Sequence, residues 1–183
     1  MSEAAVKKND SGMAKLTITL FVICAVCSLI LGLVNMVTEQ PIKDVQAAKN
    51  AAAMSAVLLA DSYDTVDYTG ADSTIQSIHK AGDAGYVVEV SPSGSFSGTF
   101  TIMVGVNRDQ TVSGVEIVKS GETSGLGDNA KKADWREQFK GLTGEVKVTK
   151  DGGSINAITG ATITSRAVSA GVTSALAAVA ELG

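Results

Sequence analysis

A short segment at residues 157–165 gathers hydroxyl side chains around a glycine. Its hydroxyl residues are Thr159, Thr162, Thr164 and Ser165. Gly160 and Ala161 separate the first two, and an alanine-rich stretch of helical period follows. The unpaired N–H groups at a helix start favour a bound phosphate, but serine and threonine also cap helices without any ligand. The residue types alone leave both interpretations open.

A second candidate segment, residues 121–127, is rich in glycine and lies between an expected strand and an expected helix. Its three glycines permit a sharply bent backbone whose N–H groups can hold an anion or approach a flat ring. The candidate binding residues here are Glu122, Thr123, Gly125, Leu126 and Gly127. The loop lacks the Lys-Ser/Thr of a P-loop and the full dinucleotide-binding spacing. Since most glycine-rich connections are simple turns, it is by itself a weak indication of a binding site.

Alternating apolar residues predict a sheet ahead of both segments. The expected strands are residues 86–90, 100–106 and 112–117, which are rich in valine and isoleucine, and the second and third of them have a period of two. Gly114 interrupts the alternation of the third strand, which is typical of a β-bulge. The pattern predicts a strongly twisted antiparallel meander.

Helical segments are expected after the second candidate loop and at the end of the chain. Residues 128–139 predict a helix with an Asp or Asn cap, in which Trp135 and Phe139 share a face. Residues 145–149 predict a further short strand, and residues 165–182 predict a closing helix. The apolar stripe of that helix is Val168, Val172, Ala175, Leu176 and Val179. The expected fold class of this part is α+β, an antiparallel sheet with packed helices.

Residues 16–38 contain no charged side chain. As a helix the run is about 34 Å long, which is enough to cross a hydrocarbon core. A cleaved signal peptide is the alternative, but its apolar region is shorter and ends in small residues. We therefore predict one N-terminal transmembrane helix in the cell membrane. Lys7, Lys8 and Lys15 precede it, so the N-terminus is expected in the cytoplasm and the C-terminal domain outside.

The chain is accordingly expected to have four parts. Pro41 predicts a break or restart of helix outside the membrane, followed by a helix over residues 42–60 and a loop over residues 61–73. The expected parts are a cytoplasmic arm at 1–15, a transmembrane helix at 16–38, a juxtamembrane helix and loop at 39–73, and an exported domain at 74–183.

Composition excludes some classes of function. The net charge is −4 and no basic stripe with interleaved aromatics occurs, so nucleic acid is not an expected partner. Both cysteines, Cys24 and Cys27, lie within the apolar run, where a helix–helix contact is the simpler interpretation of their spacing. The chain has no second ligand pair, so no metal site is expected.

Three sequence features together resemble the FMN-binding domain family. They are the run at residues 100–106, the loop Glu122-Thr123-x-Gly125-Leu126-Gly127 and the motif Thr159-Gly160-Ala161-Thr162-x-Thr164-Ser165. Their order and spacing look like the G subunit of the Rnf electron-transport complex, which is similar to the C subunit of the sodium-translocating NADH:quinone reductase. The resemblance covers residues 86–183, and the single N-terminal anchor fits the same family.

This resemblance implies a covalent cofactor. In that family a flavin transferase joins FMN through a phosphodiester bond to the last threonine of the motif, which is Thr162 here. The loop at 122–127 would then hold the ring system, with Leu126 against it. Asn156 and Ser124 stand where family members often have Asp and Pro, and neither departure removes the acceptor hydroxyl.

The implied function is electron relay rather than substrate turnover. As a member of this family, the chain would pass electrons between ferredoxin and NAD within a membrane complex that translocates sodium ions or protons. No catalytic residue is expected in the chain, and its partners would be the other membrane subunits, the flavin transferase and the lipid bilayer. The alternative is an exported, membrane-anchored module that binds a ligand or partner without a redox cofactor.

Overall fold

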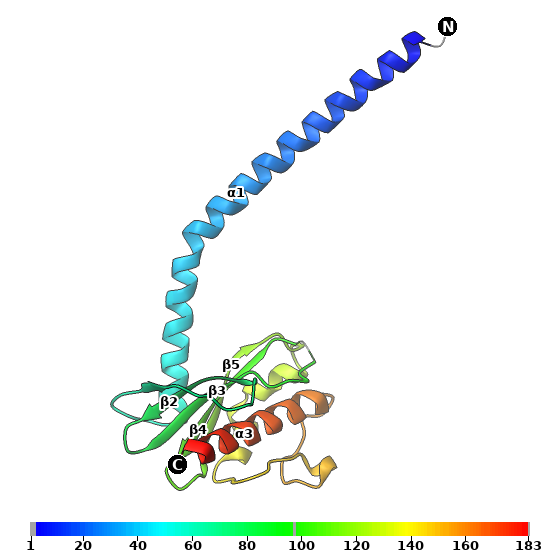
Figure 1. The fold of residues 1–183 in the computed structure, drawn as a ribbon. Coiled ribbons are helices and arrows are strands. Elements are labelled where there is room, and N and C mark those ends of the chain that lie inside the picture. Colours follow the sequence, from blue (N-terminus) through cyan, green and yellow to red (C-terminus); the bar gives the residue numbers. More distant parts are fainter. Residues whose placement is uncertain (1–2, 97, 183) are drawn as a thin grey trace. The chain divides into compact units, whose positions relative to one another are not determined.

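The computed structural model describes residues 3–96 and 98–182 (Figure 1). The elements, with 3-10 helices labelled η, are α1 (Glu3–Val57), β1 (Asp64–Val66), β2 (Ile75–Ala81), β3 (Gly85–Val90), β4 (Phe100–Asn107), β5 (Val112–Ser120), η1 (Gly127–Lys131), α2 (Ala133–Arg136), η2 (Glu137–Phe139), η3 (Thr149–Asp151) and α3 (Thr162–Leu182). The chain divides after Ala47 into two compact units, which are described separately.

The first unit is the long N-terminal part of α1. From Gly12 onward the helix is apolar and long enough to cross a membrane, and none of its most apolar stretch is buried. Side chains such as Leu20 and Phe21 are 63% and 72% exposed. An exposed apolar surface of this length is unfavourable in water and suits a lipid environment.

The expected interruption of the helix at Pro41 was wrong. Pro41 lies inside α1, which runs without a break to Val57 instead of restarting and ending at residue 60. Proline has no N–H, so the carbonyl one turn earlier loses its helical partner, but the rest of the ladder continues on both sides. Among the apolar side chains of this part of the helix, Val57 is buried, whereas Ile42 and Val45 are exposed.

In the second unit, the five strands form one antiparallel sheet in the order β1-β2-β3-β4-β5. The three predicted strands are confirmed as β3, β4 and β5. The predicted irregularity at Gly114 is also present, because Gly105 pairs with Gly114 while Val106 pairs with Val112, which leaves Ser113 as the extra residue. Such a bulge increases the local twist of the strand.

The first two strands were not expected. β1 lies within the predicted loop at residues 61–73, and β2 follows it. Neither strand carries a clear apolar alternation, since β1 is mostly exposed and β2 buries only Ile78 and Ala81. Pairing with β3 makes β2 a strand, and pairing with β2 makes β1 one; this information is not local.

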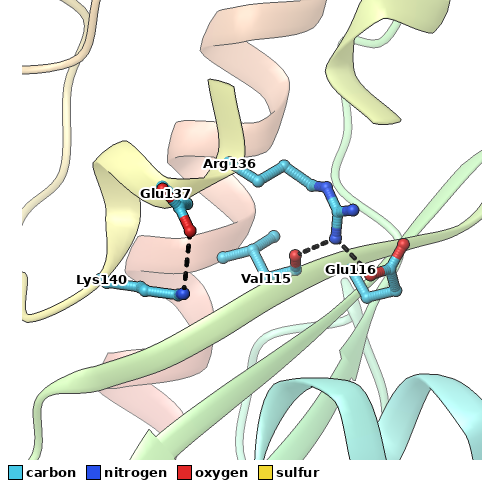
Figure 2. Close-up of polar contacts among 5 residues, drawn as sticks. All are labelled: Val115, Glu116, Arg136, Glu137 and Lys140. Atoms are coloured by element: carbon cyan, nitrogen blue, oxygen red, sulfur yellow. Dashed lines mark hydrogen bonds and ion pairs between the residues drawn. The ribbon is translucent and has the colours of Figure 1, made fainter. Parts of the chain in front are cut away.

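The helix predicted over residues 128–139 is also wrong as one element. Three short helices replace it, η1, α2 and η2: the extended Lys132 separates η1 from α2, α2 runs directly into η2, and no side chain caps any of the three. Arg136 Nη1 donates to the Val115 carbonyl at 2.7 Å and pairs with Glu116, which ties α2 to β5 (Figure 2). The predicted shared face is confirmed, since the rings of Trp135 and Phe139 pack edge to face with their centroids 5.2 Å apart.

The strand predicted at residues 145–149 does not form. Its burial does alternate, with Val146 and Val148 buried, but the segment pairs with no sheet strand. The Val146 N–H donates to Thr173 Oγ1 on α3 at 2.9 Å, and Val148 makes a single bridge with Ile155. The alternating burial therefore comes from packing of this segment against α3, not from pairing in a sheet. The segment runs directly into η3.

Helix α3 supplies the main core. It begins at Thr162, three residues before the predicted start, and its whole predicted stripe is buried. The helix is apolar enough to pass as a membrane span, but the relevant stretch is 61% buried, as expected for a core helix. Val88 and Val104 of the sheet belong to the same core as α3. The opposite face, with Met103, packs on the last turns of α1.

Candidate functional site

The start of α3 is built by an internal hydrogen-bond set. Gly160 has a φ of +78°, and the turn before the helix closes through a bond from Ala161 N to Ile158 O at 2.9 Å. Ser165 Oγ is buried, accepts from Ile158 N at 2.9 Å and donates to Ala161 O at 3.0 Å. Ser165 therefore stabilises the turn, whereas Thr162 Oγ1 accepts a hydrogen bond from outside the helix.

The glycine-rich loop connects β5 to η1. Gly125 has a φ of +79°, which favours glycine, and its carbonyl accepts from Asn129 Nδ2 at 2.8 Å. The Leu126 N–H donates to the Thr123 carbonyl at 3.1 Å, so the loop is a closed turn. This turn leaves the Leu126 side chain 45% exposed.

A hydrogen bond joins the loop to the helix. Thr164 Oγ1 donates to Glu122 Oε2 at 2.8 Å, although the residues are 42 positions apart. Gly127 lies directly behind this pair, and a Cβ there would be 2.7 Å from Thr164 Oγ1 and closer still to Glu122 Oε2. Gly127 is therefore required by clearance, since its φ is not positive. The two segments that the sequence singled out form one site.

Between the two segments lies an open cavity of about 450 Å³. Eight of the predicted site residues line it, namely Glu122, Thr123, Leu126, Gly127, Gly160, Ala161, Thr162 and Thr164. Three predicted residues lie outside its wall. Ser165 is buried, while Gly125 and Thr159 are exposed.

Three further residues of the cavity wall were missed by sequence reasoning: Phe96, Lys150 and Ile163. Phe96 belongs to the connection between β3 and β4, and no local pattern assigns it to the site. Lys150 stands beside a glycine turn shortly before the hydroxyl motif, and a lysine near an expected phosphate was a usable signal. Its ammonium donates to Thr162 Oγ1 at 3.3 Å.

The turn that carries Lys150 is anchored to α3. Arg166 donates to both carboxylate oxygens of Asp151, from Nε at 2.7 Å and from Nη2 at 2.6 Å. These hydrogen bonds, with the nearby positive charges, hold the pKa of the Asp151 carboxyl below its usual range. The pKa of Arg166 is raised by the same contact. The left-handed Gly152, at a φ of +83°, ends the turn.

The cavity offers two kinds of chemistry side by side. Beyond α1, the exposed large hydrophobic side chains among the described residues are Leu59, Phe96, Leu126 and Ile163. The last three line the cavity, and the hydroxyl of Thr162 and the ammonium of Lys150 lie on the same wall. Apolar surface for a ring, next to a helix start and a cation for a phosphate, fits a flavin mononucleotide.

Comparison with known proteins agrees with this geometry. Residues 95–177 match the FMN-binding domain family, a range that includes both the glycine-rich loop and the start of α3. The chain thus carries an FMN-binding domain, and FMN is its cofactor.

Relatives similar over most of their length define the family further. The chain is 33% identical to the G subunit of the Na(+)-translocating ferredoxin:NAD(+) oxidoreductase complex of Acetobacterium woodii, over 86% of this chain and 87% of that one. It is 31% identical to the G subunit of the ion-translocating oxidoreductase complex of Methanosarcina acetivorans, over 87% and 90% of the two chains. The chain belongs to this family, the G subunits of the ion-translocating Rnf oxidoreductase complexes. The predicted resemblance is confirmed, and with the apolar α1 it indicates a membrane location.

Proposed function

We propose that this chain relays electrons within an ion-translocating ferredoxin:NAD oxidoreductase complex, through an FMN joined by a phosphodiester bond to Thr162. The observation that carries the proposal is the position of Thr162. It is the first residue of α3, it is half-buried, and it lies on the wall of the cavity between helix and loop. The names of the family relatives support the electron-transfer role.

Different parts of the site would hold the phosphate and the ring of the cofactor. The N–H groups at the start of α3 and the dipole of the helix favour a phosphate on Thr162. Leu126 and Ile163 offer apolar surface to a ring, and the Glu122–Thr164 pair fixes the loop against the helix. FMN supplies the redox chemistry when bound, and the protein sets its position and potential. Covalent attachment keeps the cofactor in place outside the cytoplasm, where the cell's flavin pool cannot replace it.

The topology that we propose is single-pass, with residues 1–15 in the cytoplasm, 16–38 in the bilayer, 39–73 next to the membrane and 74–183 as the exported FMN domain. The partners are the other membrane subunits of the complex and, during maturation, a flavin transferase. Residues 16–38 contain no acidic or basic side chain, so the ion path belongs to other subunits.

A denaturing gel tests whether the chain carries flavin. The full chain is produced with a flavin transferase, unfolded and separated, and its band is examined for flavin fluorescence. A fluorescent wild-type band is expected, and in the assembled complex the flavin absorbance should be bleached on reduction by ferredoxin. A wild-type band without flavin fluorescence would contradict the proposal and favour an anchored binding module without a redox cofactor.

Protease treatment of intact protoplasts tests the orientation. Because the N-terminal arm carries lysines and the domain after α1 is proposed to be exported, added protease should remove the domain and spare the first residues. Protection of the whole chain in intact cells, with cleavage only after lysis, would reverse the topology.

A further inference from the structure

The Lys150 ammonium lies at the hydroxyl that we propose as the FMN acceptor. It donates to Thr162 Oγ1 at 3.3 Å and lines the same cavity. Lys150 is exposed, so it is not held there by burial. Its position must come from the backbone that carries it.

That backbone is a closed turn. The Thr149 N–H donates to the Ile155 carbonyl at 2.8 Å, and the Asp151 and Gly153 N–H groups donate to the Val148 carbonyl at 2.9 and 3.0 Å. Val148 is buried in the core, so the turn is fixed to the body of the domain. The backbone at Lys150 is therefore held in place by hydrogen bonds to buried residues.

The ion pair between Asp151 and Arg166 sets the direction of that turn. Arg166 lies one helical turn after Thr162, on the same face of α3. Its two-pronged contact with Asp151 holds η3 against the start of the helix and matches the guanidinium charge with a carboxylate. Arg166 is thus paired with Asp151, whereas the Lys150 ammonium donates to Thr162.

We infer that Lys150 is a ligand of the FMN phosphate and a positioning residue for its attachment to Thr162, aligned by the Asp151–Arg166 pair. This rests on the proposed attachment site. In the attachment step Thr162 Oγ1 forms a bond to the phosphorus of an anhydride-activated flavin, a flavin dinucleotide. The anhydride P–O bond breaks, the nucleotide leaves with the electron pair, and the hydroxyl proton passes to a base of the transferase. Lys150 offsets the negative charge at the phosphate oxygens during this step and in the product.

The test uses the full-length chain in detergent, a flavin transferase and flavin adenine dinucleotide, with attachment followed by intact mass. Lys150→Met should lower kcat/KM for the acceptor chain about threefold to tenfold, the effect of one exposed charge-assisted hydrogen bond. Lys150→Arg should restore most of the rate. Lys147→Met is the matched control, because Lys147 pairs with Glu145 and lies outside the cavity wall, and it should behave as wild type.

A second measurement does not depend on the rate. Each variant is driven to complete attachment and the phosphodiester is observed by phosphorus NMR. Lys150→Met should shift the resonance, whereas Lys147→Met should not. If the wild type gains no flavin on Thr162, the proposed function fails. If it does gain flavin there, and Lys150→Met matches Lys147→Met in rate and resonance, or Lys150→Arg is as slow as Lys150→Met, the role of Lys150 is overturned.

Discussion

Gly105 and Gly127 lie in different regions of the domain, and neither has room for a Cβ. Gly105 is in β4, where a Cβ would lie 2.6 Å from the Val57 carbonyl oxygen at the end of α1. Ser113 Oγ donates to the same oxygen at 2.6 Å. Gly127 instead faces the side chains of Glu122 and Thr164 at the cavity.

The difference is between backbone and side-chain neighbours. The Val57 carbonyl cannot move without shifting the end of α1 on the sheet, so crowding at Gly105 affects the whole domain. Glu122 and Thr164 can rotate away, at the expense of their mutual hydrogen bond. Gly105 is therefore needed for the packing of the fold, and Gly127 is needed for the geometry of the site.

Gly105→Ala should therefore give the largest loss of stability, about 3 kcal/mol, as expected for overpacking against a fixed backbone. Unfolding of the detergent-solubilised chain, followed by Trp135 fluorescence, measures it. Gly114→Ala is the matched control in the neighbouring strand, because its Cβ would lie 3.3 Å from Val57 atoms and needs only a small adjustment. An equal or larger loss in Gly114→Ala would contradict the account.

Gly127→Val should retain covalent flavin but shift its absorbance and slow electron transfer in the complex. The midpoint potential should move by about 20–60 mV, which corresponds to about 1–3 kcal/mol between the oxidised and two-electron-reduced states. Gly125→Ala strains the same loop without entering the space between Glu122 and Thr164, and its potential should stay close to wild type. A folded, flavin-bearing Gly127→Val protein with wild-type spectrum, potential and rate would show that the loop is only a turn.

Thr164→Val keeps the shape of the side chain but removes its hydroxyl. Since the hydroxyl donates to a carboxylate, the loss of stability should be about 1–2 kcal/mol, with attachment at Thr162 retained. Thr164→Ser keeps the donor and serves as the control. Thermal unfolding and intact mass together check both parts, and equal stability of the Val and Ser variants would exclude a role for this hydrogen bond.

Asp151→Asn should have the smallest effect, and the effect should depend on pH. The contact with Arg166 lowers the pKa of folded Asp151, so its contribution is complete above the unfolded value of about 3.9 and is lost as the pH falls through the folded value. The Tm difference between wild type and Asp151→Asn should be constant from about pH 5 upward and disappear in stronger acid. A difference that grows as the pH falls would reverse the sign and contradict the ion pair.

Local patterns were enough to predict β3 to β5 and the buried stripe of α3. They failed where pairing is decided by tertiary contacts. The segment at residues 145–149 has the alternation of a strand, yet Val146 bonds to Thr173 on a helix. The strands β1 and β2 lack a strong pattern and form because pairing extends the sheet outward from β3, first to β2 and then to β1.

The candidate site divides in the same way. Both chemical segments could be predicted because their residue types are unusual, with hydroxyls at a helix start and closely spaced glycines in a loop. Their meeting was implied only by the family resemblance, because the hydrogen bond between Thr164 and Glu122 spans 42 positions and no local pattern encodes it. The nearness of Lys150 to the hydroxyl motif in the sequence was a usable signal, but its contact with Thr162 depends on how backbone hydrogen bonds and the Asp151–Arg166 pair hold η3, which is tertiary information.

The assignment of Thr162 as the acceptor is the central claim, and intact-mass measurement tests it most directly. The wild-type chain, Thr162→Ala and Thr159→Ala are each produced with a flavin transferase. The wild type should gain the mass of one FMN less one water, and Thr162→Ala should gain none. Thr159→Ala should retain flavin, because Thr159 is exposed and outside the cavity wall. Full attachment of FMN to the Thr162→Ala chain would contradict the claim.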